Sequence, residues 1–414
     1  MYRGIGLDIR CLDAPPLDRK RTMTQTQAID IHRLLEIIAS VSGGDAALHE
    51  PEFGGREWEY VKDALDSGWV SSSGSYVDRF ESDIGAFTGA KRAVATVTGT
   101  AALHIALILA GVEAGDEVIV PALTFVATAT AVTYLGAIPH LADIERETLG
   151  IDPQKLDEYL QATTEPETRG RRNLETGRTI SAVVGMHTFG HPVDLIALVE
   201  VCDHHNLTLV EDAAESLGSY YRDKHTGTFG KVGVLSFNGN KIITTGGGGM
   251  ILTDDEELAN EAKHLTTTAK VPHTWRYDHD RLGFNYRLPN LNAALGCAQL
   301  EQVPTFLSDK RALAERYAAA LAVFDGVSVV VEPEGCKSNY WLNALLLDAE
   351  IADSRDELLS VAHESGLGLR PAWSPMHHLP MFRNSPRMDL TTSEDLFRRI
   401  VNLPSSARLG RRGR

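Results

Sequence analysis

Residues 236–250 read SFNGNKIITTGGGGM and contain one lysine, Lys241, in a setting that is unusual for this residue type. Lys241 lies among small, polar and apolar residues, and four consecutive glycines, Gly246 to Gly249, follow it. Because glycine has no side chain, the backbone here can pass close to a ligand. Most lysines lie on the surface, and that alternative stands for Lys241. The stretch favours a lysine held beside a ligand, in a loop between two strands of a sheet.

Strand-like and helix-like segments alternate upstream of this loop. The apolar runs that read as strands are 93–97, 117–120, 138–141, 180–185, 207–211 and 232–237, and one more begins at 250. The stretches between them that read as helices include 100–110, 125–134, 153–160 and 195–205. This alternation predicts an α/β fold with a mostly parallel sheet flanked by helices.

The whole chain divides into three predicted units. Residues 1–23 read as a disordered tail, and residues 24–300 as a large domain that begins with a helical segment. A long helix is predicted over 291–303. Residues 301–414 read as a smaller C-terminal α+β domain, and the basic residues 408–414 as a loose tail.

Composition excludes some classes of partner. The 414 residues include 40 Lys and Arg against 56 Asp and Glu, a formal net charge of −16. Such an acidic chain is poorly suited to nucleic acid or to an anionic membrane surface. The longest apolar stretch is shorter than the roughly 20 residues that a membrane-spanning helix needs. The four cysteines form no CxxC pair, which indicates reduced thiols and a cytoplasmic location.

The segment Thr98-Gly99-Thr100-Ala101 follows a strand and begins a helix. Free backbone N–H groups and the helix dipole favour a phosphate at such a point, and the Thr100 hydroxyl could add a hydrogen bond. The alternative is an ordinary strand-to-helix turn in which a threonine caps the helix. Taken alone, the ordinary turn is favoured, because short glycine motifs are common.

Asp212 ends the apolar strand 207–211, and ligand sites in open α/β sheets lie at the carboxyl ends of strands. A carboxylate there can pair with a protonated pyridine nitrogen and so keep the ring electron-withdrawing. A helix N-cap is the equal alternative. Glu211 and Glu215 are expected to face solvent or to support the site.

A phosphate-binding helix start, a strand-end carboxylate and a lysine among glycines are together what pyridoxal phosphate requires. Lys241 would hold the cofactor and act as the base. Phe125, at another strand end, could stack on the pyridine ring, and Ser236 could bind the phosphate. A core aromatic and a strand hydroxyl bonded to backbone are the alternatives for these two residues.

Histidines offer a competing interpretation as a metal site. His187 and His191 are four residues apart, and His377 and His378 are adjacent. Gly190 and the following proline disfavour a helix that would place the first pair on one face. No HExxH motif is present, so we expect no metal, and a zinc hydrolase is kept only as a rival.

Six blocks in order resemble the fold-type I, pyridoxal-phosphate-dependent sugar aminotransferases of the DegT/DnrJ/StrS type. They are TGTAALHIAL (98–107), AGDEVIVPALTFVATATAV (114–132), MHTFGHPVD (186–194), VEDAAESLGS (210–219), SFNGNKIITTGGGGM (236–250) and GFNYRLPNLNAALGCAQL (283–300). The resemblance covers about residues 51–404. It implies a mostly parallel seven-stranded sheet, pyridoxal 5′-phosphate as cofactor, and a homodimer with shared active sites.

The resemblance also implies residue roles. Lys241 is similar to the Schiff-base lysine and Asp212 to the partner of the pyridine nitrogen. Glu215 lies where the family often has Gln or His, near the ring oxygen of the cofactor. Asn285 resembles the residue that reaches the cofactor phosphate of the neighbouring subunit. Those similar to phosphate binders or to the stacking ring are Gly99, Thr100, Ala101, Ser236 and Phe125.

The substrates implied are L-glutamate as amino donor and a nucleotide-linked keto sugar. The subgroup most similar acts on UDP-4-keto-6-deoxy-N-acetylhexosamines as 4-aminotransferases, on the way to nonulosonic acids. The segments 338–343 and 370–377 support this, and weaker candidates for sugar contacts are Arg287, Trp341, Trp373 and His377. The alternatives are a 3-aminotransferase for a dTDP-sugar, a cyclitol aminotransferase and a non-enzymatic regulatory protein that holds the cofactor.

Overall fold

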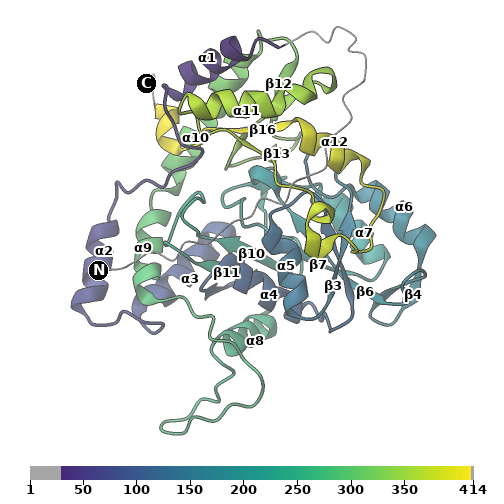
Figure 1. The fold of residues 1–414 in the computed structure, drawn as a ribbon. Helices are drawn as coiled ribbons and strands as arrows, with labels where there is room; N and C mark the ends of the chain where they lie inside the picture. Colours follow the sequence, from purple (N-terminus) through teal and green to yellow (C-terminus); the bar gives the residue numbers. More distant parts are fainter. Residues whose placement is uncertain (1–28, 412–414) are drawn as a thin grey trace, which may run out of the picture.

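The computed structural model describes residues 29–411, and a central sheet forms the middle of its larger part (Figure 1). The expected tail, 1–23, lies outside the described residues. The strands of the sheet follow the order β1 (Arg92–Thr96), β11 (Gly249–Thr253), β10 (Val232–Ser236), β7 (Thr208–Asp212), β6 (Thr179–Met186), β2 (Glu117–Pro121) and β3 (Ile138–Ala142). A hairpin, β4 (Thr164–Glu167) and β5 (Gly170–Asn173), extends this sheet through β6.

Strand direction confirms the mostly parallel sheet. The pairs β10–β7, β7–β6, β6–β2 and β2–β3 are parallel, whereas β11 is antiparallel to both β1 and β10. Therefore all of these strands except β11 end at the same edge of the sheet. Loops after these ends converge, and this edge is where open α/β sheets bind their ligands.

Helices cover both faces because alternate strand residues are apolar on each side. One face packs against α4 (Gly99–Leu109), α5 (Val126–Tyr134) and α8 (Glu256–Thr266), through residues such as Val94 and Val234. The other face packs against α3 (Ser75–Thr88) and α9 (Asn290–Leu300) at one end of the sheet. At the other end it packs against α6 (Pro153–Thr163) and α7 (Leu195–His204).

A second, four-stranded antiparallel sheet lies above the first in Figure 1. Its strands follow the order β12 (Val327–Val329), β14 (Asn343–Leu347), β16 (Ile400–Leu403) and β15 (Arg370–Pro371). It packs with α10 (Val303–Leu321) and α11 (Arg355–Glu364), and α12 (Thr391–Arg399) leads into β16. This is the α+β arrangement expected after residue 300.

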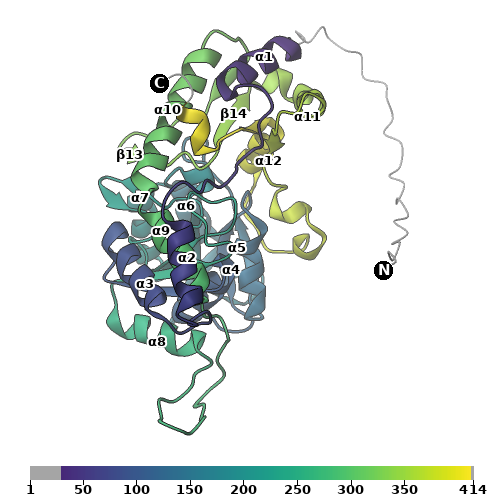
Figure 2. The same ribbon diagram turned by 90° about the vertical axis from the view of Figure 1, so that its left-hand side faces the viewer.

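The helix α1 (Ile31–Ser42) departs from the expected division of the chain. Its apolar face, with Ile31, Leu34 and Ile38, joins the same core as Leu313 of α10 and Leu345 of β14. The expectation that residues 24–300 form one unit is therefore wrong for α1. The chain reaches the large layer only afterwards, at α2 (Glu57–Asp66) and α3, as Figure 2 shows.

Two local predictions also differ from the structure. The single helix expected over 291–303 is two, because α9 ends at Leu300 and α10 begins at Val303. Residues 408–411 are not loose: they form a 3-10 helix, η5 (Ala407–Arg411), in which Leu409 is buried. Arg408 pairs with Glu50, and Arg411 pairs with Glu52 and Asp309.

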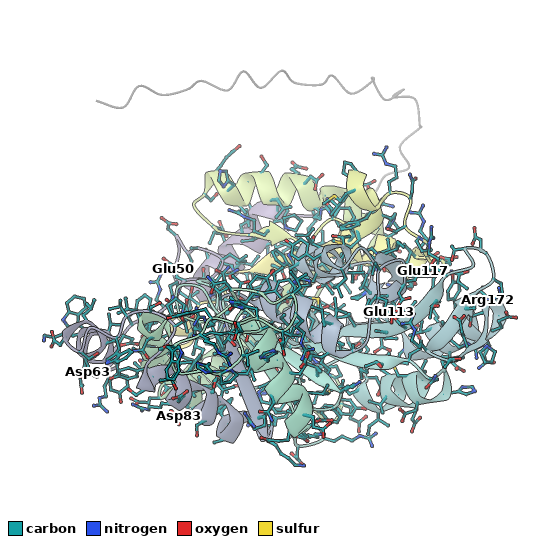
Figure 3. All side chains as sticks on the ribbon, turned by 90° about the horizontal axis from the view of Figure 1, so that it is seen from below. Glu50, Asp63, Asp83, Glu113, Glu117 and Arg172 are labelled. Carbon is teal, nitrogen blue, oxygen red and sulfur yellow. The ribbon has the colours of Figure 1, made fainter. Side chains whose placement is uncertain are left out.

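Figure 3 shows the side chains from below, with Asp63 and Arg172 at opposite edges of the view. In residues 29–411, no helix combines the length and the apolar character needed to span a bilayer.

Candidate active site

A cavity of about 350 Å³ opens at the carboxyl edge of the central sheet. It lies where β1, β10, β7 and β2 end and their loops converge. Predicted site residues at all four strand ends line it. Two tryptophans from the C-terminal part of the chain, Trp341 and Trp373, complete the wall. The predicted residues in its wall are Gly99, Thr100, Phe125, Asp212, Glu215, Ser236, Lys241, Trp341 and Trp373.

Lys241 lies in the loop after β10, with only 12% of its side chain exposed. Its Nζ atom is 3.4 Å from Oε1 of Glu215 and 4.1 Å from the ring centre of Trp341. The amine thus lies between a carboxyl group and an aromatic face. The surface alternative for this lysine is excluded by its position.

Asp212 is buried at the end of β7. The Thr128 hydroxyl donates to Oδ2 at 2.8 Å, and the Ala214 N–H donates to Oδ1 at 3.2 Å. Burial raises the pKa of Asp212, while these hydrogen bonds and the charge of Lys241 act in the opposite direction. A protonated ring nitrogen placed here would compensate for the lost solvation of the carboxylate.

Glu215 and Glu211 are both buried, so of the two expected alternatives the solvent-facing one is excluded, and support of the site stays a prediction. Glu215 enters the cavity, and the Phe189 N–H donates to its Oε2 at 3.0 Å. Burial raises the pKa of Glu215 to about 7, although Lys241 acts against the shift. Glu211 points elsewhere: it accepts hydrogen bonds from the backbone N–H groups of Gly227, Phe229 and Gly230.

The start of α4 provides a cradle for an anion. Thr98 caps this helix by accepting a hydrogen bond from the Ala101 N–H at 3.0 Å, which confirms the cap, while phosphate binding at this segment stays a prediction. Ala101 itself is not in the cavity wall. A Cβ atom at Gly99 would lie 2.9 Å from Cβ of Ser236, so only glycine lets the helix start approach that hydroxyl so closely.

Aromatic rings form the outer wall of the cavity. Phe125 is 48% exposed, and its ring centre is 6.4 Å from that of Trp373 in an edge-on arrangement. Trp373 also packs on Phe189, with ring centres 5.0 Å apart. Phe125 is therefore not a core residue, and its exposed ring is available to cover a planar ligand.

Three predicted residues lie away from this cavity. Asn285 pairs with Thr267, and Arg287 pairs with Thr96, as isolated bridges. His377 bonds to Glu394 through Nε2, and His378 bonds to the same carboxyl oxygen at 2.8 Å. The His377 cluster could hold a metal, but its atoms already hydrogen-bond to one another.

The sequence reasoning missed several wall residues: Met186, Asn238, Asn240 and Leu103. It also missed Thr128, which holds Asp212 from one turn of α5 beyond Phe125. The signal was its spacing: Thr128, one of three threonines in α5 (VATATAVTY), follows Phe125 by three residues, about one helical turn.

These features fit pyridoxal phosphate. The glycine-lined helix start and Ser236 suit its phosphate, the buried Asp212 suits its ring nitrogen, and Lys241 supplies the amine between them. The model of the DegT/DnrJ/EryC1/StrS aminotransferase family matches residues 51–412. The chain belongs to this family. It is therefore a pyridoxal-phosphate-dependent aminotransferase.

Some proteins similar to this aminotransferase have names that refer to nucleotide-linked sugars. It is 37% identical to the GDP-perosamine synthase of Vibrio cholerae over 359 residues, which cover 86% of this chain and 93% of that one. It is also 37% identical to EpsN of Bacillus subtilis, a putative pyridoxal phosphate-dependent aminotransferase, with 87% and 91% covered. The aminotransferase is similar in fold to DesI, whose crystal structure was analysed in the presence of its TDP-sugar product. There the TM-score is 0.74 at 30% identity, with 88% and 90% of the two chains covered.

Proposed function

We propose that this aminotransferase transfers the amino group of L-glutamate to a nucleotide-linked keto sugar, with Lys241 as the reacting amine. One observation carries the proposal: Lys241, Asp212 and Glu215 line one cavity beside the glycine-lined start of α4. That set of groups provides a base, a partner for a ring nitrogen and a partner for a phosphate.

Each group has a distinct task in this mechanism. Bound pyridoxal phosphate acts as an electron sink for the carbon that carries the amino group. Asp212 would face its ring nitrogen, and the start of α4 with Ser236 would hold its phosphate. Lys241 takes the proton from the amine-bearing carbon of glutamate and returns a proton in the second half-reaction. Phe125 and Trp341 exclude water from one side of the reacting groups.

Glu215 is placed beside Lys241 for proton exchange. Its carboxyl lies 3.4 Å from Nζ, and burial raises its pKa to about 7. Above that pH the carboxylate can accept a proton. Below it the carboxyl is neutral and holds its own proton. Glu215 is thus poised for proton exchange at neutral pH.

For the acceptor, we favour a GDP-linked 4-keto-6-deoxy hexose. The support is the similarity to GDP-perosamine synthases, which is spread over most of both chains. The UDP-linked N-acetylhexosamine expected from the sequence is the first alternative, and a dTDP-linked sugar is the second.

The free thiols of Cys202 and Cys297 are buried and suit a reducing compartment, so we place the reaction in the cytoplasm.

A half-reaction assay tests this proposal. The purified holoenzyme should show an absorbance band at roughly 400–430 nm that moves toward roughly 330 nm when L-glutamate is added. Keto sugars linked to GDP, UDP and dTDP are then added separately, and the return of the first band is timed. The GDP-linked sugar should restore it fastest. If none of the three restores it, the acceptor is not a nucleotide sugar of this kind, and a cyclitol would be tried next.

We also propose that two copies share their active sites. Residues 267–289 form a long loop that extends beyond α8, away from the body of the subunit (Figures 1 and 2). Its large apolar side chains Trp275, Tyr277 and Leu282 are 76–82% exposed, and Trp58 of α2 is 80% exposed. Exposed apolar patches of this kind mark protein interfaces. Asn285, on the same loop and outside the cavity of its own chain, would reach that of the partner.

A further inference from the structure

Lys310 is a buried cation in α10, and none of its surface is exposed. Its ammonium donates to the carbonyl oxygens of Tyr340 at 3.3 Å, Trp341 at 3.0 Å and Ser405 at 2.5 Å. An ammonium has three N–H donors, so these three acceptors satisfy it. Burial lowers the pKa of Lys310 to about 7, because the charged form loses its hydration inside the protein.

Two of the three carbonyls belong to a strained turn. Tyr340 has a φ of 48°, in the left-handed region that non-glycine residues rarely adopt. The Trp341 N–H donates to Oδ1 of Asn339 at 2.8 Å, and the Asn339 amide donates to the carbonyl of Glu215 at 2.9 Å. The two consecutive carbonyls of this turn both accept from Lys310, so the ammonium satisfies these two acceptors.

The side chain of Trp341 reaches the reacting amine. The indole N–H donates to the carbonyl of Asn240 at 2.6 Å, and the ring centre lies 4.1 Å from Nζ of Lys241. Trp341 therefore contacts two lysines, one through its backbone carbonyl and one through its ring. A change at Lys310 can reach Lys241 through this single residue.

We propose that Lys310 is a positioning residue, which holds the indole of Trp341 over the amine of Lys241 by binding the carbonyls of the Tyr340–Trp341 turn. The inference rests on the proposed function, in which Lys241 is the reacting amine. Without the ammonium, the turn is free to leave its left-handed conformation, and the indole moves with it. Lys241 then loses its aromatic cover and becomes more accessible to water.

A purely structural role for Lys310 would be to close the core between α10 and residues 404–406. Tyr317 offers a matched control for that role. It lies on the same helix, is equally buried, and donates its hydroxyl to the carbonyl of Pro404 at 3.0 Å. The variant Tyr317→Phe removes a buried hydrogen bond to this segment and leaves the Trp341 turn untouched.

Reductive methylation of the cofactor-free, full-length chain tests the inference. Modification of Lys241 by formaldehyde and cyanoborohydride is followed by peptide mass spectrometry. Trp341→Ala and Lys310→Met should each raise the rate about 2- to 5-fold, the size expected for loss of a cation–π contact. Tyr317→Phe should match the wild type. The double variant Lys310→Met/Trp341→Ala should be no faster than Trp341→Ala alone, because both changes act through one ring.

Two outcomes would overturn the inference. In the first, Lys241 is methylated in Lys310→Met at the same rate as in Tyr317→Phe. In the second, the rate increase in the double variant is the product of the two single increases. If circular dichroism shows that Lys310→Met is unfolded, Lys310→Gln replaces it, since its amide keeps two N–H donors and should give an intermediate rate.

A second test uses the absorbance spectrum of the holoenzyme. In Lys310→Met, the pH midpoint of the roughly 400–430 nm band should fall, because the aromatic face no longer favours the charged nitrogen. A wild-type protein that forms no such band with pyridoxal phosphate would refute the proposed function, while the methylation rates would still report on Lys310.

Discussion

At the scale of single residues, the site combines two buried carboxyls that differ in the partners that act against the effect of burial. Asp212 is stabilised as a carboxylate by Thr128, Ala214 and Lys241 despite its burial. Glu215 has fewer such partners, and its pKa rises to about 7. Burial raises the pKa of both carboxyls, and Glu215, with a pKa of about 7, can exchange a proton at neutral pH.

Lys241→Ala should abolish turnover and also the absorbance band at roughly 400–430 nm, because no other group at that position can bind the cofactor covalently. The measurement is a spectrum with added pyridoxal phosphate beside a coupled assay. Lys241→Arg, which keeps the charge, is the control for electrostatic disruption. Wild-type turnover in Lys241→Ala would remove this residue from the chemistry.

Glu215→Gln should remove a step in the pH dependence of kcat. A carboxyl with a pKa of about 7 is a base only above that pH, so the wild-type kcat should rise as pH increases through 7. The variant should be about 10- to 100-fold slower and flat between about pH 6 and about pH 8. The profile is measured with L-glutamate in excess. A variant that keeps the step would assign it to another group.

At the scale of elements, the sequence predicted the convergence of Asp212, Ser236 and Phe125, because parallel strands end at one edge whatever their exact bounds. It did not predict that Glu215 is buried, because an acidic residue after a strand normally faces water. Nor did it fix the place of Trp341, which reaches Lys241 through tertiary packing. The break between α9 and α10 was missed because it consists of only Glu301 and Gln302, and both residue types are good helix formers.

The start of α4 gives a prediction at this scale. In Gly99→Ala the added methyl would lie 2.9 Å from Cβ of Ser236, so the helix start must move away from that hydroxyl. The affinity for pyridoxal phosphate should fall about 10-fold or more, while the fold is kept. Titration of the cofactor measures it. Gly54→Ala, whose methyl would meet its nearest neighbour at 3.7 Å, is the matched control and should bind normally.

At the scale of the whole molecule, the proposed dimer explains why one part of the sequence pattern is not at the site of its own chain. Asn285 belongs to a block of the family pattern, yet the structure places it on the projecting loop, outside the cavity. A single subunit is then an incomplete enzyme, and both copies of the loop are needed for two complete sites.

Mixing inactive variants tests this arrangement. Lys241→Ala and Asn285→Ala subunits, exchanged in equal amounts, should recover roughly a quarter of wild-type activity, because half of the dimers hold one intact site. Heterodimers are isolated by two different affinity tags to confirm exchange. If such heterodimers stay inactive, Asn285 acts within its own subunit or not at all.

The packing of α1 against the small sheet has a consequence for synthesis on the ribosome. About 260 residues separate α1 from α10, so translation at about 5–20 residues per second leaves the helix without its partner for tens of seconds. Throughout that time the apolar stripe of Ile31, Leu34 and Ile38 has nothing to pack against. The nascent chain thus presents an early binding site for a chaperone, and the large layer can fold before the small one is complete.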